Sequence, residues 1–302
     1  MPVNLNASLS DSPLPALSPW KLREKNFTWG EKTYLMGILN VTPDSFSDGG
    51  EFHSLNAALA QAQYMVSAGA DILDIGGQST RPQADEVPLE EELKRIVPVI
   101  QVLRQGDLNQ PIAATTISVD TTRATVARAA IHAGADIVND ISGATYDAEM
   151  LPAVAELDVP IVLMHIRGTP KTMQSLTDYS DLMAEIYEFL AHRVAAAVAA
   201  GIAPDRIILD PGIGFAKSYE QNLEILRQLA HLKSLGCPLL VGVSRKSFIG
   251  RILNQPDPKQ RVWGTAAACC AAIAASADIL RVHDVAPMRE VCQMADAIWR
   301  QR

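Results

Sequence analysis

Two copies of one short pattern, AGADILDIGG (residues 68–77) and AGADIVNDIS (residues 133–142), decide the fold that this sequence predicts. In each copy a glycine ends a helical pattern, and an apolar run follows directly. Glycine ends helices because it adopts the left-handed backbone conformation without strain. A helix that turns at once into a buried strand is the repeating unit of α/β proteins. Finding it twice indicates that the unit recurs along the chain.

Similar apolar runs recur with little polar alternation, as expected for parallel strands buried on both faces. We expect eight strands, at Tyr34–Leu39, Ile72–Ile75, Ile117–Val119, Ile137–Val138, Ile161–Met164, Ile207–Leu209, Leu239–Val243 and Ile279–Val282. Helical periodicity fills the gaps, over Leu55–Ala68, Leu89–Leu103, Thr122–Ala133, Ala148–Leu157, Tyr179–Ala200, Gln221–Leu235, Gln260–Ser276 and Met288–Trp299. Eight strand–helix units predict a single (β/α)8 TIM barrel of about 250 residues. An open doubly wound sheet would normally have fewer strands or a second domain.

The sequence divides into two regions. Residues 1–27 are rich in Pro, Ser and Asn and lack core-forming periodicity, so we expect a flexible N-terminal arm. Residues 28–302 contain no linker, and we expect them to form the barrel as one domain.

Composition excludes several classes of function. The formal net charge is -8, which argues against nucleic acid or an anionic membrane surface as a partner. The four cysteines have no metal-ligand spacing, and small buried thiols in a reducing compartment are the simplest explanation. The N-terminus has neither the basic start nor the apolar core of a secretory signal. We therefore expect a cytoplasmic protein with no membrane span.

Polar residues end the expected strands, which in a TIM barrel places them at the catalytic mouth. Asp120, Asn139 and Asp210 end three of the strands and form a floor of hydrogen-bonding groups for a flat heterocycle with several N–H donors. Lys246, after the seventh strand, can donate to acceptors on the same ring. Each residue taken alone could instead be a helix cap, a turn or a solvated charge. Eight strands that each deliver a polar group to one rim favour a ligand site, because burial there is costly without partners.

A second group at the rim can bind an anion. Arg281 and His283 lie two residues apart on a strand and so share a face. Together with Arg81 they form the only obvious anion site, and Asn40 can supply a metal-ligand oxygen beside it. A flat base at the bottom and a phosphate at the rim is a definite substrate shape.

At this point the sequence resembles a known family, the dihydropteroate synthases. Seven motifs in order carry the resemblance: ILNVTPDSFSDGG (38–50), ISVDT (117–121), IVNDISG (137–143), LMHIRGTPKTMQ (163–174), ILDPGIGFAK (208–217), VGVSRKSFIG (241–250) and RVHDV (281–285). The resemblance implies a homodimeric TIM barrel that needs Mg²⁺. It implies that 6-hydroxymethyl-7,8-dihydropterin pyrophosphate condenses with 4-aminobenzoate to give 7,8-dihydropteroate and pyrophosphate in folate biosynthesis.

The motif positions imply a role for each site residue. The pterin contacts would be Asp120, Asn139, Asp210 and Lys246, in a pocket lined by Met164, Phe215 and Gly242. The pyrophosphate contacts would be Arg81, Arg281 and His283, with Mg²⁺ on Asn40. The 4-aminobenzoate site would be shaped by Phe46, Asp48, Thr80, Arg81, Pro82, Lys246 and Ser247, and sulfonamides would compete there. The second loop departs from the family pattern at Gln78 and Gln83, where an acid and a glycine are usual.

The expected chemistry is a dissociative displacement. Pyrophosphate held by cations becomes a better leaving group, and the pterin carries the positive charge left behind, which Asp120 and Asp210 stabilise. Asp120, Asp210, Lys246 and Arg281 are the residues expected to carry the reaction. Two alternatives remain open at the level of sequence. One is a pterin-binding methyltransferase that uses methyltetrahydrofolate and a corrinoid partner, and the other is a non-catalytic pterin-binding paralogue.

Overall fold

The computed structural model describes residues 17–41, 50–79, 86–105 and 111–300. At its centre, eight parallel strands form one sheet in the order β8-β7-β6-β5-β4-β3-β10-β9. These strands are β3 (Tyr34–Asn40), β4 (Ile72–Gly76), β5 (Thr116–Asp120), β6 (Ile137–Asp140), β7 (Ile161–Met164), β8 (Ile207–Asp210), β9 (Leu240–Val241) and β10 (Ile279–Val282). A single bridge between Leu209 and Leu239 joins the two ends of the sheet. The sheet is therefore a nearly closed barrel, as predicted.

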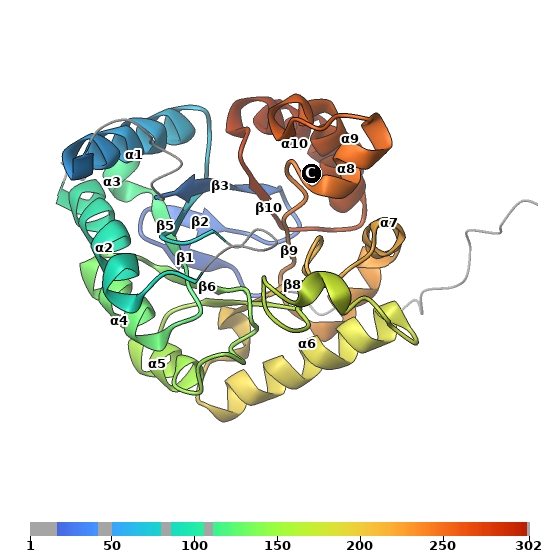
Figure 1. Ribbon diagram of the computed structural model, residues 1–302, viewed down its shortest axis with the longest axis horizontal. Coiled ribbons are helices and arrows are strands. Elements are labelled where there is room, and N and C mark those ends of the chain that lie inside the picture. The colour runs from blue at the N-terminus through green and yellow to red at the C-terminus, as the bar shows by residue number, and fades with distance from the viewer. Residues whose placement is uncertain (1–16, 42–49, 80–85, 106–110, 301–302) are drawn as a thin grey trace, which may run out of the picture.

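Helices surround this barrel (Figure 1). They are α1 (Gly50–Ser67), α2 (Leu89–Gln105), α3 (Pro111–Ala114), α4 (Ala124–Ala133), α5 (Met150–Leu157), α6 (Leu182–Ala199), α7 (Tyr219–Gln228), α8 (Ser247–Leu253), α9 (Val262–Ala274) and α10 (Val285–Trp299). Every expected strand and helix is present. The expected helix 221–235 is divided, because α7 tightens into the 3₁₀ segment η4 (Leu229–Leu235). The short helices α3 and α8 were not predicted. No helix in the described ranges is long and apolar enough to span a membrane.

The aspartate of the repeated AGAD pattern ties the start of one strand to the strand beside it. Asp71 accepts a hydrogen bond from the backbone N–H of Leu35, at 2.8 Å, which ties the start of β4 to the neighbouring β3. Asp136 does the same for Ile117 and β5, also at 2.8 Å. Asp278 makes a third copy, since its carboxylate accepts from the N–H of Leu239 at 2.8 Å. Each of these carboxylates also pairs with a cation, which offsets the cost of burying it.

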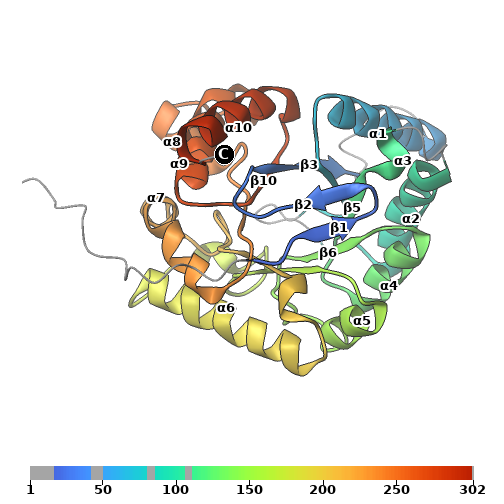
Figure 2. The same cartoon turned by 180° about the vertical axis from the view of Figure 1, so that it is seen from behind.

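The N-terminal arm is shorter than predicted. Residues 20–27 form an antiparallel hairpin, β1 (Trp20–Leu22) and β2 (Lys25–Phe27), which lies across the N-terminal end of the barrel (Figure 2). Trp20 and Phe27 are 7% and 1% exposed and pack against the inward side chains of the barrel strands. The expectation of a flexible arm is therefore wrong for residues 20–27, because burial of two aromatic rings outweighs the cost of ordering the segment. Residues 1–16 lie outside the described residues.

The barrel interior has an apolar base. Inward side chains from successive strands join Trp20 and Phe27 in one cluster: Tyr34, Met36, Ile72, Ile137, Val162, Ile208, Leu240 and Ile279. On four of the strands, the next inward position toward the C-terminal end carries a polar group. On β4, β6, β8 and β10 these polar groups are Asp74, Asn139, Asp210 and Arg281, and they mark the level of the candidate site.

Candidate functional site

Strand register brings the predicted polar residues to one mouth. Asp120 on β5 pairs with Asn139 on β6, and Met164 on β7 pairs with Asp210 on β8. Asp120, Asn139 and Asp210 are 5%, 4% and 7% exposed, so each is buried but reaches the edge of solvent. The predicted floor of acceptors is thus brought together in space.

Arg281 does not stand apart from this floor. Its Nε lies 2.6 Å from Oδ2 of Asp74, and its Nη2 lies 2.7 Å from Oδ2 of Asp120. Burial alone would lower the pKa of Arg281, but the two carboxylates outweigh that effect and the pKa is raised. The guanidinium is therefore a permanent cation that links β10 to β4 and β5 across the barrel.

Two carboxyl groups in the mouth have pKa values raised toward pH 7. Burial raises the pKa of Asp120 to about 7, although the attraction of Arg281 opposes that rise. Burial raises the pKa of Asp210 to about 6, against the hydrogen bond from the Gly212 N–H. Both groups therefore change charge within or near the physiological range, which is typical of functional sites.

The turn after β8 holds Asp210 in place. The Gly212 N–H donates to Oδ1 of Asp210 at 2.7 Å. Gly212 has φ +70°, and a Cβ at this position would lie 1.9 Å from the carbonyl oxygen of His165. Only glycine fits here, because both the backbone conformation and the close approach exclude a side chain.

Lys217 fixes the far end of the same turn. Its side chain is buried, with Nζ 2.9 Å from Nδ1 of His165 and 2.8 Å from the carbonyl oxygen of Phe215. Burial lowers the pKa of Lys217 well below its usual value and lowers that of His165 to about 2. His165 is consequently a neutral residue that supports this turn. Lys217 holds the backbone that carries Phe215.

Lys246 lies over this same aromatic ring. Its Nζ is 4.2 Å from the centre of the Phe215 ring, within the range of a cation–π interaction. Burial lowers the pKa of Lys246 to about 8, with a further lowering from Arg281. The following residue, Ser247, is exposed at the start of α8.

His283 is the last rim residue in the described mouth. Its Nδ1 lies 3.0 Å from the hydroxyl oxygen of Ser244, which also accepts a hydrogen bond from the His283 N–H. Burial and the nearby Arg245 lower the pKa of His283 to about 3, so the imidazole is neutral. It can offer one hydrogen bond at Nε2 but no positive charge. Within the described mouth, the cationic part of the predicted anion site is thus Arg281.

Not every predicted residue can be placed. Asn40 ends β3 half-buried at the same rim, and Gly242 follows β9 opposite Arg281. The remaining loop positions lie outside the described residues: Phe46, Asp48, Thr80, Arg81 and Pro82. Within the described ranges, no group of three or more His, Cys, Asp or Glu side chains could hold a metal ion. The donor chemistry at Asn40, a single amide oxygen, fits Mg²⁺ only if substrate oxygens and water complete its coordination, as is usual for this ion.

Sequence reasoning assigned no role to Asp74 or to Lys217. Asp74 is completely buried in β4, between apolar neighbours. The signal was present, because a carboxylate inside an otherwise apolar strand must find a cation or another donor. Which cation it finds depends on how the barrel closes.

Known proteins are similar to this chain over the whole barrel that carries the site. The sequence matches the family described as pterin binding enzyme over residues 36–283. It is 61% identical over 282 residues to a dihydropteroate synthase of Synechocystis, covering 93% of this chain and 96% of that one. The dihydropteroate synthase of Clostridium difficile, solved in the presence of pteroic acid, superposes with a TM-score of 0.85 at 43% identity, covering 91% of this chain and 100% of that one. That of Xanthomonas albilineans, solved with 4-aminobenzoic acid, gives a TM-score of 0.82 at 43% identity, covering 90% and 95%.

Proposed function

Because the chain belongs to the dihydropteroate synthase family, we propose that its barrel mouth condenses 6-hydroxymethyl-7,8-dihydropterin pyrophosphate with 4-aminobenzoate. The products are 7,8-dihydropteroate and pyrophosphate, so the chain is a transferase of folate biosynthesis, working in the cytoplasm. The observation that carries the proposal is the convergence of Asp120, Asn139 and Asp210 beside the fixed cation Arg281. Neither the methyltransferase nor the non-catalytic alternative is favoured by the family matches.

The pterin half of the site uses the buried floor. Ionised Asp120 and Asp210 accept hydrogen bonds from the N–H edge of the pterin, and the amide of Asn139 extends this edge. Met164 and Phe215 belong to one apolar cluster at the mouth and provide a surface for the ring. Lys246, which already lies over Phe215, donates to a ring acceptor.

The pyrophosphate half uses the rim. Arg281 and His283 donate to the leaving group, and Arg81 is proposed to join them. When the methylene–oxygen bond breaks, pyrophosphate leaves with the electron pair and the pterin holds the positive charge beside Asp120 and Asp210. The amine nitrogen of 4-aminobenzoate then bonds to the methylene carbon and loses a proton to solvent. Asn40 would hold Mg²⁺, which when bound neutralises charge on the pyrophosphate oxygens.

The proposed 4-aminobenzoate site rests on the resemblance. Ser247, exposed at the start of α8, is the described member of this set beside Lys246. Phe46, Asp48, Thr80 and Pro82 are proposed to complete it. Sulfonamides, which share the aryl amine, should bind in the same place.

An assay of the purified protein tests the reaction. Pyrophosphate release from the pterin ester should depend on 4-aminobenzoate, with dihydropteroate formed in equal amount. Asp210→Asn should reduce kcat/KM at least tenfold, because a neutral amide accepts weaker hydrogen bonds from the ring N–H edge and carries no charge to stabilise the cation. Asp278→Asn is the matched control, since Asp278 is an equally buried carboxylate at the opposite end of the barrel. Pyrophosphate release at the same rate with and without 4-aminobenzoate would contradict the proposal.

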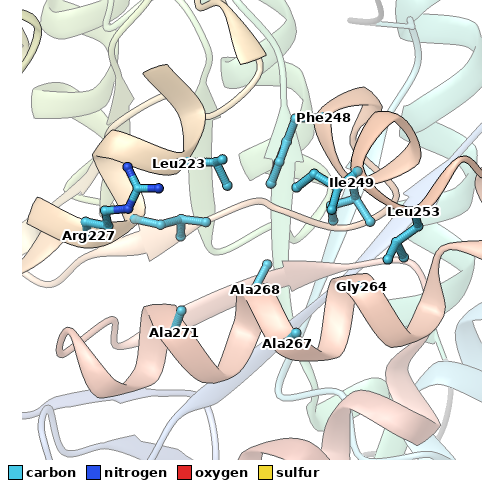
Figure 3. A pocket seen from close by; sticks show the side chains of 11 residues that line it. Leu223, Arg227, Phe248, Ile249, Leu253, Gly264, Ala267, Ala268 and Ala271 are labelled. Atoms are coloured by element: carbon cyan, nitrogen blue, oxygen red, sulfur yellow. The ribbon is translucent and has the colours of Figure 1, made fainter. Parts of the chain in front are cut away.

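An apolar groove on the outer helices supports the homodimer. It has a volume of about 350 Å³ and lies between α7, α8 and α9, lined by Leu223, Phe248, Ile249, Leu253 and Ala268 among others (Figure 3). Ile252 and Leu253 on its rim are 49% and 44% exposed, which is unusual for such side chains side by side. We propose that a second copy of the chain covers this groove. Because α8 begins directly after Lys246, the contact would also support the site.

Light scattering of one variant tests the dimer. Ile252→Glu places a charge at the groove and should convert the dimer to a monomer. Ile298→Glu is the control, because Ile298 is similarly exposed on α10, outside the groove. Identical masses for wild type and Ile252→Glu would contradict this interface.

A further inference from the structure

We propose that Asp74, to which sequence reasoning assigned no role, is a positioning residue that sets the placement of both Arg281 and Asn139 for the proposed reaction. This inference rests on the proposed function, since it concerns how that same site is held. It assigns a task to a buried carboxylate that itself contacts no substrate.

A single oxygen of Asp74 makes both contacts. Oδ2 accepts from Nε of Arg281 at 2.6 Å and from Nδ2 of Asn139 at 3.1 Å. The side chain of Asp74 is 0% exposed, and that of Arg281 is 19% exposed. Asp74 therefore connects a residue of the proposed pyrophosphate half to one of the proposed pterin half.

The contact with Asn139 determines which face of the amide the substrate meets. An amide has an N–H₂ donor and a carbonyl acceptor that are nearly equal in shape, and hydrogen bonding decides its orientation. Because Asp74 accepts from Nδ2, the carbonyl oxygen of Asn139 is turned away from it. The carbonyl is then available as a further acceptor for the N–H edge of a pterin.

The contact between Asp74 and Arg281 determines how the guanidinium is divided between Asp74 and Asp120. Arg281 reaches Asp74 through Nε and Asp120 through Nη2, so the two carboxylates hold it from different sides. Without a charge on Asp74, Asp120 would be the one carboxylate among the described residues that still pairs directly with the guanidinium. The guanidinium would then compete with the pterin for Asp120 and lie in the wrong place for the pyrophosphate. A buried guanidinium also needs a nearby counter-charge, which a neutral residue does not provide.

The charge on Asp74 also acts on Asp120. Burial raises the pKa of Asp120 to about 7, Arg281 lowers it, and Asp74 raises it through repulsion. The other charged groups that act on the pair are Glu92 on α2, Asp140 on β6 and Lys246 after β9. Loss of the Asp74 charge, with these groups unchanged, should lower the pKa of Asp120. A residue that merely supported the fold would not shift this titration.

The decisive variant is Asp74→Asn, which keeps the size of the side chain and removes its charge. Relative to wild type, we expect kcat/KM for the pterin ester to fall at least tenfold. We also expect the acidic limb of its pH dependence to move to lower pH. Asp278→Asn is again the control, and it should lower the melting temperature without changing either kinetic feature.

The outcomes separate this inference from the proposed function. A wild-type protein that does not couple pyrophosphate release to 4-aminobenzoate would refute the function itself. An active wild type, together with an Asp74→Asn variant of unchanged kcat/KM and pH dependence, would refute the positioning role alone. If Asp74→Asn does not fold, the Arg281 Nε–H signal of the wild type, assigned with Arg281→Lys, tests the contact by NMR. Slow exchange of this proton with solvent supports the contact, and fast exchange overturns the inference.

Discussion

Replacing Arg281 should disturb the binding of a pterin that carries no phosphate at all. The sequence alone suggests the opposite, namely that Arg281 serves only the leaving group. In the structure its Nη2 lies 2.7 Å from Asp120, whose pKa is about 7 with that cation in place. Arg281→Met keeps much of the side-chain volume but removes the attraction that favours the ionised form of Asp120.

The size of the effect follows from the titration of Asp120. A neighbouring arginine typically lowers the pKa of an aspartate by roughly 1–3, so its loss should raise that of Asp120 by a similar amount. At pH 7.5 the ionised fraction of Asp120 would then fall roughly three- to two-hundred-fold. Affinity for the pterin should fall by up to the same factor, because the charged carboxylate accepts strong hydrogen bonds at both oxygens, whereas the protonated acid keeps one neutral acceptor. Raising the pH should restore the affinity of the variant for the pterin.

Calorimetry with 6-hydroxymethylpterin between pH 6 and 9 measures this directly. In the wild type, affinity should be full well above pH 7, where Asp120 is ionised, and be lost as the pH falls through the pKa of Asp120. In Arg281→Met this loss should begin at higher pH, the reverse of the shift expected for Asp74→Asn. His283→Ala is the control, because the neutral His283 should matter only to the pyrophosphate ester. If Arg281→Met and wild type lose affinity at the same pH, Arg281 does not control the charge of Asp120.

Three further outcomes follow from other parts of the structure. Gly212→Ala should abolish most pterin binding in calorimetry, because its Cβ would meet the carbonyl of His165 and displace the turn that holds Asp210. Phe27→Ala should lower the free energy of unfolding in urea by about 3–5 kcal/mol, whereas deletion of residues 1–16 should leave it nearly unchanged. Chelation should remove turnover and Mg²⁺ should restore it, while Asn40→Ala should raise the Mg²⁺ concentration needed for half of the maximal rate.

The barrel could be predicted from sequence because its strands are buried on both faces. Such strands appear as uninterrupted apolar runs, and glycines mark the turns that precede two of them. The hairpin formed by β1 and β2 could not be predicted in this way. Each strand has three residues, too few to show a period, and Phe27 is buried only because the base of the barrel is there to receive it.

The site shows a similar division between local and non-local information. That Asp120, Asn139 and Asp210 share a mouth follows from their positions at strand ends, and the structure brings them together. That Arg281 is paired with Asp74 and Asp120 does not follow, because β10 is not a neighbour of β4 or β5 in the sheet. The contact exists only across the interior of a closed barrel, and no pattern along the chain records it.

The apolar base of the barrel influences the mouth because it shields the buried carboxyl groups of the mouth from water. Trp20 and Phe27 close the N-terminal end with an apolar cluster, so the polar side chains above it are separated from water on that side. Burial is the largest influence on the pKa of both Asp120 and Asp210, and it raises each to a value near neutrality. Opening the base to water should therefore stabilise the ionised carboxylates and lower both pKa values. By this reasoning the hairpin contributes to more than stability, because it helps to set the pH range in which the mouth can bind a pterin.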